Sequence, residues 1–171
     1  GRPGVPGPAV TAVVEHGDPP VAGATGPDRP RGRGQEVSPT PVKETAQAAG
    51  IDRSLQPEDG TNPSFAAAVA EREPDVIAVV AYKILPPEVF AAASEGAFNR
   101  HGALLPKYRG AAPINHAVMA GESTTGVTTF FLEPSVDTGD IILQKEMAIG
   151  PNETAGEVHD RMAELGAEAV V

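Results

Sequence analysis

The chain has 171 residues, a formal net charge of −10 and no cysteine. Disulfides and thiolate metal sites are therefore excluded, and the acidic balance argues against a protein that coats nucleic acid over its whole surface. There is no signal-peptide pattern and no apolar run near the ~20 residues that a membrane span needs, so we expect one soluble, cytoplasmic domain that makes no membrane contact.

The N-terminal stretch is rich in glycine and proline. GRPGVPGP (1–8) disfavours both a strand and a helix, whereas VAGAT (21–25) predicts a short strand. Each proline removes a donor that a sheet would need, so residues 1–12 should form no central strand. VAGAT and DVIAVVAY (75–82) should then have a gap between them or close up directly.

Two helices are expected in the next segment. One runs from Thr40 to Ala49 with a proline in its first turn, and one is capped by Asn62 and runs to Glu73. DVIAVVAY, which follows, is a continuous β-branched apolar run of the kind found in strands buried on both faces of a parallel sheet.

Strands and helices continue to alternate through the second half of the chain. The pattern predicts helices at 86–96 and 112–120 and strands at 98–101, 127–133 and 141–149. Thr154 and Glu157 form a capping-box pattern. The apolar stripe of the helix that follows contains Val158, Met162, Leu165 and Ala169. This alternation indicates an α/β domain with a mostly parallel sheet flanked by helices, spanning 1–171.

Three polar residues are candidates for catalysis. Asn99 and His101 are two apart in a predicted strand, so they share a face, and they lie where ligands bind in such sheets. Asp137, in the tight turn SVDTGD, could orient His101 or accept a proton; Asp140 is the rival carboxylate. The alternative is that these residues are only structural. His16, His116 and His159 have no such polar neighbours, and we treat them as non-functional.

These motifs together resemble a known family. NRHGALLPKYRGAAPI (99–114) with SVDTGD (135–140) is similar to the N-terminal catalytic domain of methionyl-tRNA formyltransferases, which has a Rossmann-like fold. PDRPRGRGQEVSPTPVKE (27–44), AVVAYKILPPEV (78–89) and residues 148–171 extend the similarity. The resemblance covers roughly residues 20 to 171.

The resemblance implies a reaction and roles for the three polar residues. The family transfers a formyl group from 10-formyltetrahydrofolate to an amine, without a metal. By position, Asn99 would hydrogen-bond the formyl oxygen, and His101 would stabilise the oxyanion. Asp137 would hold His101 and assist proton removal from the amine.

The resemblance also implies residues for the two substrates. The folate co-substrate would lie against Ile84, Leu85, Leu104, Leu105, Pro106 and Asp140. The initiator tRNA would meet a basic loop, and its candidate residues are Arg29, Arg31, Arg33 and Lys43. A solvated loop is the alternative for this basic stretch. We expect residues 27–41 to be long, exposed and without regular structure, because they include four prolines and two glycines.

The chain departs from the family pattern at several places. The family's first apolar strand has no counterpart, Lys83 stands where the family has Gly-Gln, and Ala103 replaces a serine. Arg100 replaces a small or apolar residue and, by alternation, should face the covered side of the sheet, where an unpaired charge is costly. The domain is expected to be incomplete at its N-terminus and to lack the family's C-terminal tRNA-binding domain.

The leading hypothesis is an enzyme of translation initiation, a monomeric formyltransferase that modifies methionyl-tRNA. Two alternatives are left open: a non-catalytic remnant or binding module of this family, and a formyltransferase or hydrolase that acts on a small amine.

Overall fold

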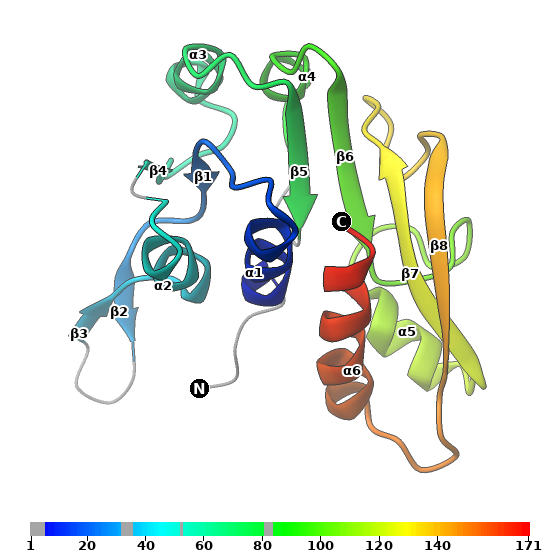
Figure 1. Ribbon diagram of the computed structural model, residues 1–171. Helices are drawn as coiled ribbons and strands as arrows, with labels where there is room; N and C mark the ends of the chain where they lie inside the picture. Colours follow the sequence, from blue (N-terminus) through cyan, green and yellow to red (C-terminus); the bar gives the residue numbers. More distant parts are fainter. Residues whose placement is uncertain (1–5, 32–35, 52, 81–83) are drawn as a thin grey trace.

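A four-stranded sheet dominates the fold. In the computed structural model, residues 6–31, 36–51, 53–80 and 84–171 are described (Figure 1). The main sheet has the order β5-β6-β7-β8, and β1-β4 and β2-β3 form two short sheets. The strands are β1 (Gly23–Ala24), β2 (Arg29–Arg31), β3 (Glu36–Ser38), β4 (Ser54–Leu55), β5 (Val76–Val80), β6 (Gly96–His101), β7 (Thr124–Phe131) and β8 (Ile141–Ala148).

Helices flank these sheets. They are α1 (Pro6–His16), α2 (Pro41–Ala48), α3 (Pro63–Ala70), α4 (Pro87–Phe90), α5 (Pro113–Met119) and α6 (Ala155–Glu168). The α/β class is confirmed, but the main sheet is mixed, since β5 and β6 are parallel and β6-β7 and β7-β8 are antiparallel. The short turn between β7 and β8 permits only an antiparallel neighbour. No helix in the described ranges is long and apolar enough to cross a membrane.

The N-terminal segment is helical. Residues 6–16 form α1, which packs against α2 and α6. The prediction that no central strand forms there is confirmed for the described residues, but the expectation that no helix would form was wrong. Pro8 falls in the first turn of the helix, where a missing backbone donor breaks no helical hydrogen bond.

The predicted helix starts are confirmed by their caps. The Thr40 side chain accepts a hydrogen bond from a backbone N–H of α2, and Asn62 does the same for α3. At α6 the capping box between Thr154 and Glu157 is complete. The predicted helix at 86–96 is shorter than expected, because only Pro87–Phe90 is helical.

The main core lies between α6 and the sheet. Val127, Val158, Met162 and Ala169 form a buried cluster, and Leu165 packs against it, so the predicted apolar stripe is confirmed. In contrast, β5 is not buried on both faces as expected. It is an edge strand of its sheet, and Val76 at its start is 53% exposed.

The alternation of IILQKEMAI (141–149) predicts that Ile141, Leu143, Met147 and Ile149 lie on one side of β8, and this is only partly correct. Met147 and Ile149 pack against the core, as expected. Ile141 and Leu143, which should share their side, are exposed. A register shift in the β7-β8 ladder lies between the pairs Thr129–Leu143 and Phe130–Ile141, so it sets Ile141 apart and leaves Leu143 in register with Met147. Such an irregularity changes which side chains face the core.

Part of the basic loop forms a β-hairpin. Arg29–Arg31 pairs antiparallel with Glu36–Ser38 as the hairpin β2-β3, so the expectation of no regular structure was wrong. Pro30 is compatible with this hairpin because a two-stranded ribbon leaves one edge of each strand unpaired. Val37 is exposed, as predicted for this loop.

A buried threonine fixes the turn that follows β6. The Thr128 hydroxyl donates to the Ala103 carbonyl at 2.7 Å and accepts from the Leu105 N–H at 3.1 Å. The Gln144 amide donates to the same hydroxyl and to the Leu105 carbonyl, each at 2.9 Å. This network connects the turn to β7 and β8.

Thr128→Val tests that network. Valine has a similar shape but leaves the Leu105 N–H buried without its acceptor, so we expect a loss of about 1–3 kcal/mol in the free energy of unfolding. Urea denaturation measures the loss. The control is Thr138→Val, since the Thr138 hydroxyl bonds an exposed carbonyl at 3.1 Å. Equal losses for both variants would contradict a special role for Thr128.

Candidate active site

Strand β6 delivers two of the predicted site residues to one face of the sheet. Asn99 lies opposite Val79 and Phe130, and His101 lies opposite Thr128 at the carboxyl end of the strand. Alternation places Asn99 and His101 on one face and Arg100 on the other. His101 is buried. In the described part of the chain, no hydrogen bond engages the Asn99 side chain, so its amide is available to a ligand.

Both ring nitrogens of His101 have a neighbour. Nε2 lies 2.7 Å from the Tyr108 carbonyl oxygen, and Nδ1 lies 3.5 Å from Asp137 Oδ2. A carbonyl can only accept a hydrogen bond, so Nε2 carries the proton in this contact. The predicted approach of His101 to Asp137 is therefore confirmed, and it pairs an imidazole with a carboxylate that is 9% exposed.

The Asp137 turn is held by the loop after β6. The Gly110 N–H donates to Asp137 Oδ2 at 2.8 Å, and Arg109 Nε donates to the Asp137 carbonyl at 2.8 Å. Tyr108, Ala112 and Asp137 have φ values of 57°, 51° and 52°. Non-glycine residues seldom adopt this conformation, and such residues cluster at functional sites.

The other side of this loop is fixed by Glu122. Its carboxylate accepts from the Tyr108 hydroxyl at 2.8 Å and from Lys107 at 3.1 Å. The hydrogen bond from Tyr108 and the contact with Lys107 lower the pKa of Glu122, and the same carboxylate raises the pKa of Tyr108. Glu122 thus fixes the residue whose carbonyl engages His101.

Gly139 brings the turn against β7. A Cβ atom built on Gly139 would overlap the Phe131 carbonyl. We therefore expect Gly139→Ala to displace the turn and lower the melting temperature by several degrees, with the largest NMR shift changes at Asp137 and Gly110. Gly26→Ala is the matched control, because a Cβ there meets no atom within 4 Å. A Gly139→Ala protein with unchanged shifts at Asp137 would refute this packing.

The predicted folate residues occupy different environments. Leu105 is buried, Ile84 is exposed, and Leu85 lines an apolar groove beside β5. Leu104 is half-buried, whereas Pro106 and Asp140 are exposed. The Asp140 carbonyl accepts from the Phe131 N–H at 3.0 Å. The turn carrying Leu104 and Leu105 follows directly on His101.

The predicted tRNA residues separate into two groups. Arg29 is exposed and lies 3.8 Å from Glu58, whereas Arg33 and the side chain of Arg31 lie outside the described residues. Lys43, the fourth candidate, has partners within the chain. Its ammonium donates at 2.7 Å to both Asp28 and Gln56, so it holds the base of the hairpin together.

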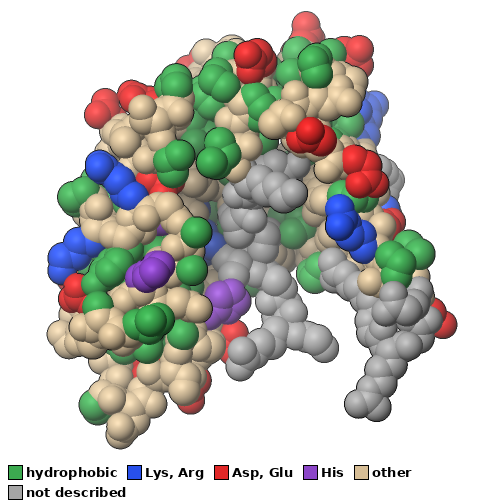
Figure 2. All heavy atoms as spheres, turned by 180° about the vertical axis from the view of Figure 1, so that it is seen from behind, with side chains coloured by type: hydrophobic (Ala, Val, Ile, Leu, Met, Phe, Trp, Pro, Cys, Tyr) green, Lys and Arg blue, Asp and Glu red, His purple; other side chains and the backbone are tan. Residues whose placement is uncertain are grey.

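Charged side chains are dispersed on one face of the protein. On the face in Figure 2, the visible Lys and Arg side chains are scattered among Asp and Glu. No cluster of three or more His, Cys, Asp or Glu side chains suited to a metal ion occurs among the described residues.

Sequence reasoning missed the backbone groups of the site. The Tyr108 carbonyl and the Gly110 N–H engage His101 and Asp137, and main-chain groups carry no residue-specific signal. The one hint was the glycine in KYRG, which has a φ of 85° and allows the backbone to approach the carboxylate.

Sequence comparisons agree on one family. A family model described as Formyl transferase matches residues 15–171. The methionyl-tRNA formyltransferase of Chlorobium luteolum is 54% identical over 148 residues, which cover 86% of this chain and 47% of that protein. That of Pelotomaculum thermopropionicum is 48% identical over 172 residues, covering 100% of this chain and 55% of that protein. The chain thus spans about half the length of the curated relatives it matches.

Solved structures share the fold. Glycinamide ribonucleotide transformylase 1 from Symbiobacterium toebii aligns with a TM-score of 0.77 at 22% identity, covering 95% of this chain and 78% of that one. Phosphoribosylglycinamide formyltransferase from Anaplasma phagocytophilum gives 0.79 at 18% identity, with coverages of 98% and 78%. At such identities the likeness concerns the fold alone.

Proposed function

The chain belongs to the formyl transferase family, and we propose that its site transfers a formyl group from 10-formyltetrahydrofolate to the amino group of methionyl-tRNA. The observation that carries the proposal is the Asp137–His101–Tyr108 arrangement beside the free amide of Asn99. It combines donors for an oxygen that gains charge with a carboxylate that can receive a proton, as acyl transfer requires.

The transfer joins the acceptor amine to the formyl carbon. As that C–N bond forms, the bond from the formyl carbon to the folate nitrogen breaks, and the proton lost by the amine ends on that nitrogen. Asn99 donates to the formyl oxygen. His101 keeps its Nε2–H on the Tyr108 carbonyl. It donates to the charged oxygen from Nδ1, 3.5 Å from Asp137, when the ring carries its second proton. Asp137 takes up the amine proton and releases it toward the folate nitrogen as that nitrogen leaves the formyl carbon.

The tRNA acceptor is favoured by the names of the relatives and by the basic hairpin. Methionyl-tRNA formyltransferases match the chain at 43–54% identity, and the hairpin segment carries Arg29, Arg31 and Arg33. Arginines on a hairpin suit phosphate contacts, which position a nucleic acid without reading its sequence.

Calorimetric titration with a non-transferable 10-formyltetrahydrofolate analogue tests the folate part. We expect one site per chain, weakened about five- to thirtyfold by Asn99→Ala, since the amide would lose a hydrogen bond worth about 1–2 kcal/mol. Asn62→Ala, which removes a helix cap on α3, is the control for a general loss of stability. The absence of heat with a folded chain would contradict the proposal.

Arg33→Ala tests the tRNA part. We expect weaker binding of methionyl-tRNA and a salt-dependence slope reduced by about 0.7–0.9 per lost phosphate contact, with folate binding unchanged. Filter binding at several salt concentrations measures both quantities. The control is Glu58→Gln, which removes the negative charge 3.8 Å from Arg29 and should change tRNA binding in the opposite direction. An equal loss of folate binding in Arg33→Ala would assign the loop a structural role instead.

A further inference from the structure

Tyr108 is held at both of its ends. Its main-chain carbonyl lies 2.7 Å from His101 Nε2, and its hydroxyl donates to Glu122 Oε1 at 2.8 Å. The residue has a φ of 57°, a left-handed conformation that is unfavourable for a side chain with a Cβ. The two contacts therefore oppose a relaxation of the backbone that would turn the carbonyl away from His101.

The two anchors of Tyr108 belong to one rigid unit. Glu122 lies in the turn between α5 and β7, where its N–H donates to the Ala117 carbonyl at 3.1 Å. β7 pairs with β6, and Thr128 of β7 lies opposite His101 of β6. The same pair of strands thus positions the carboxylate and the imidazole, and the loop residue Tyr108 bridges them.

Glu122 is suited to hold a hydroxyl group. The hydrogen bond from Tyr108 and the contact with Lys107 lower the pKa of Glu122, so at neutral pH its carboxylate is charged and can only accept. A charged acceptor makes a stronger hydrogen bond than a neutral one. Lys107 donates to the same oxygen at 3.1 Å, but its side chain is 65% exposed. It therefore provides a matched contact that does not reach His101.

The state of the His101 ring depends on the Tyr108 carbonyl. Nε2 must carry a proton to face a carbonyl oxygen, so in the neutral ring Nδ1 has none. Nδ1 lies 3.5 Å from Asp137 Oδ2. Without the carbonyl, the proton could reside on either ring nitrogen, and the edge of the ring that faces Asp137 would no longer be defined.

We propose that Glu122 is a positioning residue for formyl transfer, which acts through the hydroxyl and the carbonyl of Tyr108 to fix the orientation and tautomer of the His101 ring. Its role in the reaction rests on the proposed function, whereas its hold on the ring does not. Neither Glu122 nor the Tyr108 hydroxyl needs to touch a substrate for this role.

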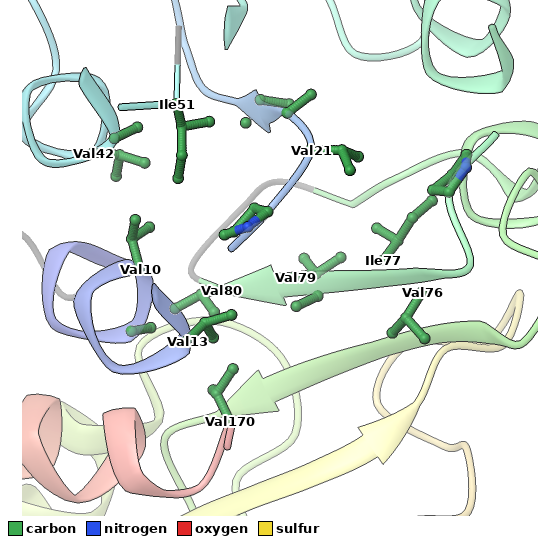
Figure 3. Close-up of a pocket in the computed structure, with 18 of the residues that line it drawn as sticks. Val10, Val13, Val21, Val42, Ile51, Val76, Ile77, Val79, Val80 and Val170 are labelled. Atoms are coloured by element: carbon green, nitrogen blue, oxygen red, sulfur yellow. The ribbon is translucent and has the colours of Figure 1, made fainter. Parts of the chain in front are cut away.

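The residues that hold His101 do not line the apolar groove between β1 and β5. Figure 3 shows that groove with Val10 of α1 and Val79 of β5 on its two sides, so the gap predicted between VAGAT (21–25) and DVIAVVAY (75–82) is confirmed. A change in the Tyr108 contacts should therefore leave the groove as it is.

Single-turnover formyl transfer at saturating folate and methionyl-tRNA tests the role of Glu122. We expect Tyr108→Phe and Glu122→Ala each to slow transfer at least about tenfold, because the imidazole is no longer held in the reactive geometry. The double variant should be no slower than the slower single variant, since both changes break one contact. Glu122→Gln keeps an oxygen acceptor and Lys107→Met spares Tyr108, so both should stay within about threefold of the parent rate, and no variant should change the KM for folate by more than about threefold.

Nitrogen-15 NMR of the histidine rings reports the hold on His101 without any reaction. At a pH at which the ring is neutral, the parent chain and Lys107→Met should show a protonated Nε2 and an unprotonated Nδ1 at His101. Tyr108→Phe and Glu122→Ala should show a mixture of the two tautomers. The signals of His16 and His159 should not change. If Glu122→Ala does not fold, Tyr108→Phe decides the question, because it removes a single oxygen atom.

Two results would overturn the role of Glu122. One is a parent rate together with unchanged His101 signals in Tyr108→Phe, and the other is an equal slowing by Lys107→Met, which would assign the effect to the charge of the loop. A parent chain that transfers no formyl group would contradict the proposed function and this role with it. An active parent chain with unaffected variants would overturn only the role of Glu122.

Discussion

Replacing Arg100 by leucine is expected to stabilise this chain by about 2–3 kcal/mol. The guanidinium lies on the covered face of β6, where Arg100 is 7% exposed. Its Nη1 reaches only the Met162 carbonyl, at 3.5 Å, and its Nε has no hydrogen-bond partner among the described residues. The location predicted from strand alternation is therefore confirmed.

The size of the effect follows from desolvation. Burial lowers the pKa of Arg100 to about 10, which corresponds to about 3 kcal/mol against the charged form. Leucine removes that cost and leaves apolar contacts with α6. The guanidinium also occupies the space that a Cβ on Gly166 would need. Gly166→Ala should thus be less damaging in an Arg100→Val background than in the parent chain.

Urea denaturation at neutral pH measures the stabilisation by Arg100→Leu. Arg161→Leu is the matched control, because Arg161 is exposed and paired with Glu153 at 2.6 Å. We expect that control to change stability by less than about 1 kcal/mol, in the destabilising direction. A destabilised Arg100→Leu protein would show that the guanidinium makes a stabilising interaction in the folded chain.

Asp137→Asn is expected to reduce formyl transfer by roughly 10²–10⁴-fold while leaving the fold intact. Asparagine keeps an oxygen that can accept from the Gly110 N–H, so the turn should hold. It removes the charge that faces His101 and the group that receives the proton. Because the loss concerns the chemical step, folate binding should change only a few-fold.

The control for this substitution is Asp140→Asn, three residues along the same turn. Asp140 is exposed, and its main chain, rather than its side chain, bonds Phe131. Single-turnover rates at saturating folate give the comparison. Equal rates for Asp137→Asn and the parent chain would remove Asp137 from the chemistry, and a large loss in Asp140→Asn would favour the rival carboxylate.

Local signals in the sequence predicted the later half of the fold well. Thr154 with Glu157 located the start of α6, and the spacing of Val158 and Met162 identified its buried face. These predictions succeeded because capping and helical periodicity depend on residues within one or two turns. The i, i+2 spacing of Asn99 and His101 likewise depends only on the pleat of a strand.

Predictions that depend on distant pairing were weaker. DVIAVVAY reads as a strand covered on both sides, yet its exposure depends on whether a neighbour fills the groove. The sequence gives no sign that Lys43 contacts Asp28 and Gln56, and its role as a nucleic-acid contact stays a prediction. The Tyr108 carbonyl and Gly110 N–H were invisible for a related reason, because main-chain groups are placed by the whole loop. Pairing and loop closure bring such groups together across the fold.

The most direct test is transfer of an isotope-labelled formyl group from 10-formyltetrahydrofolate to methionyl-tRNA by this chain under single-turnover conditions. We predict that label appears on the aminoacyl-tRNA and that Asn99→Ala slows its appearance by about 10²–10³-fold, as expected when a donor to the developing oxyanion is removed. A folded chain that binds the folate analogue but transfers no label would contradict the account, as would an Asn99→Ala variant that transfers label at the parent rate.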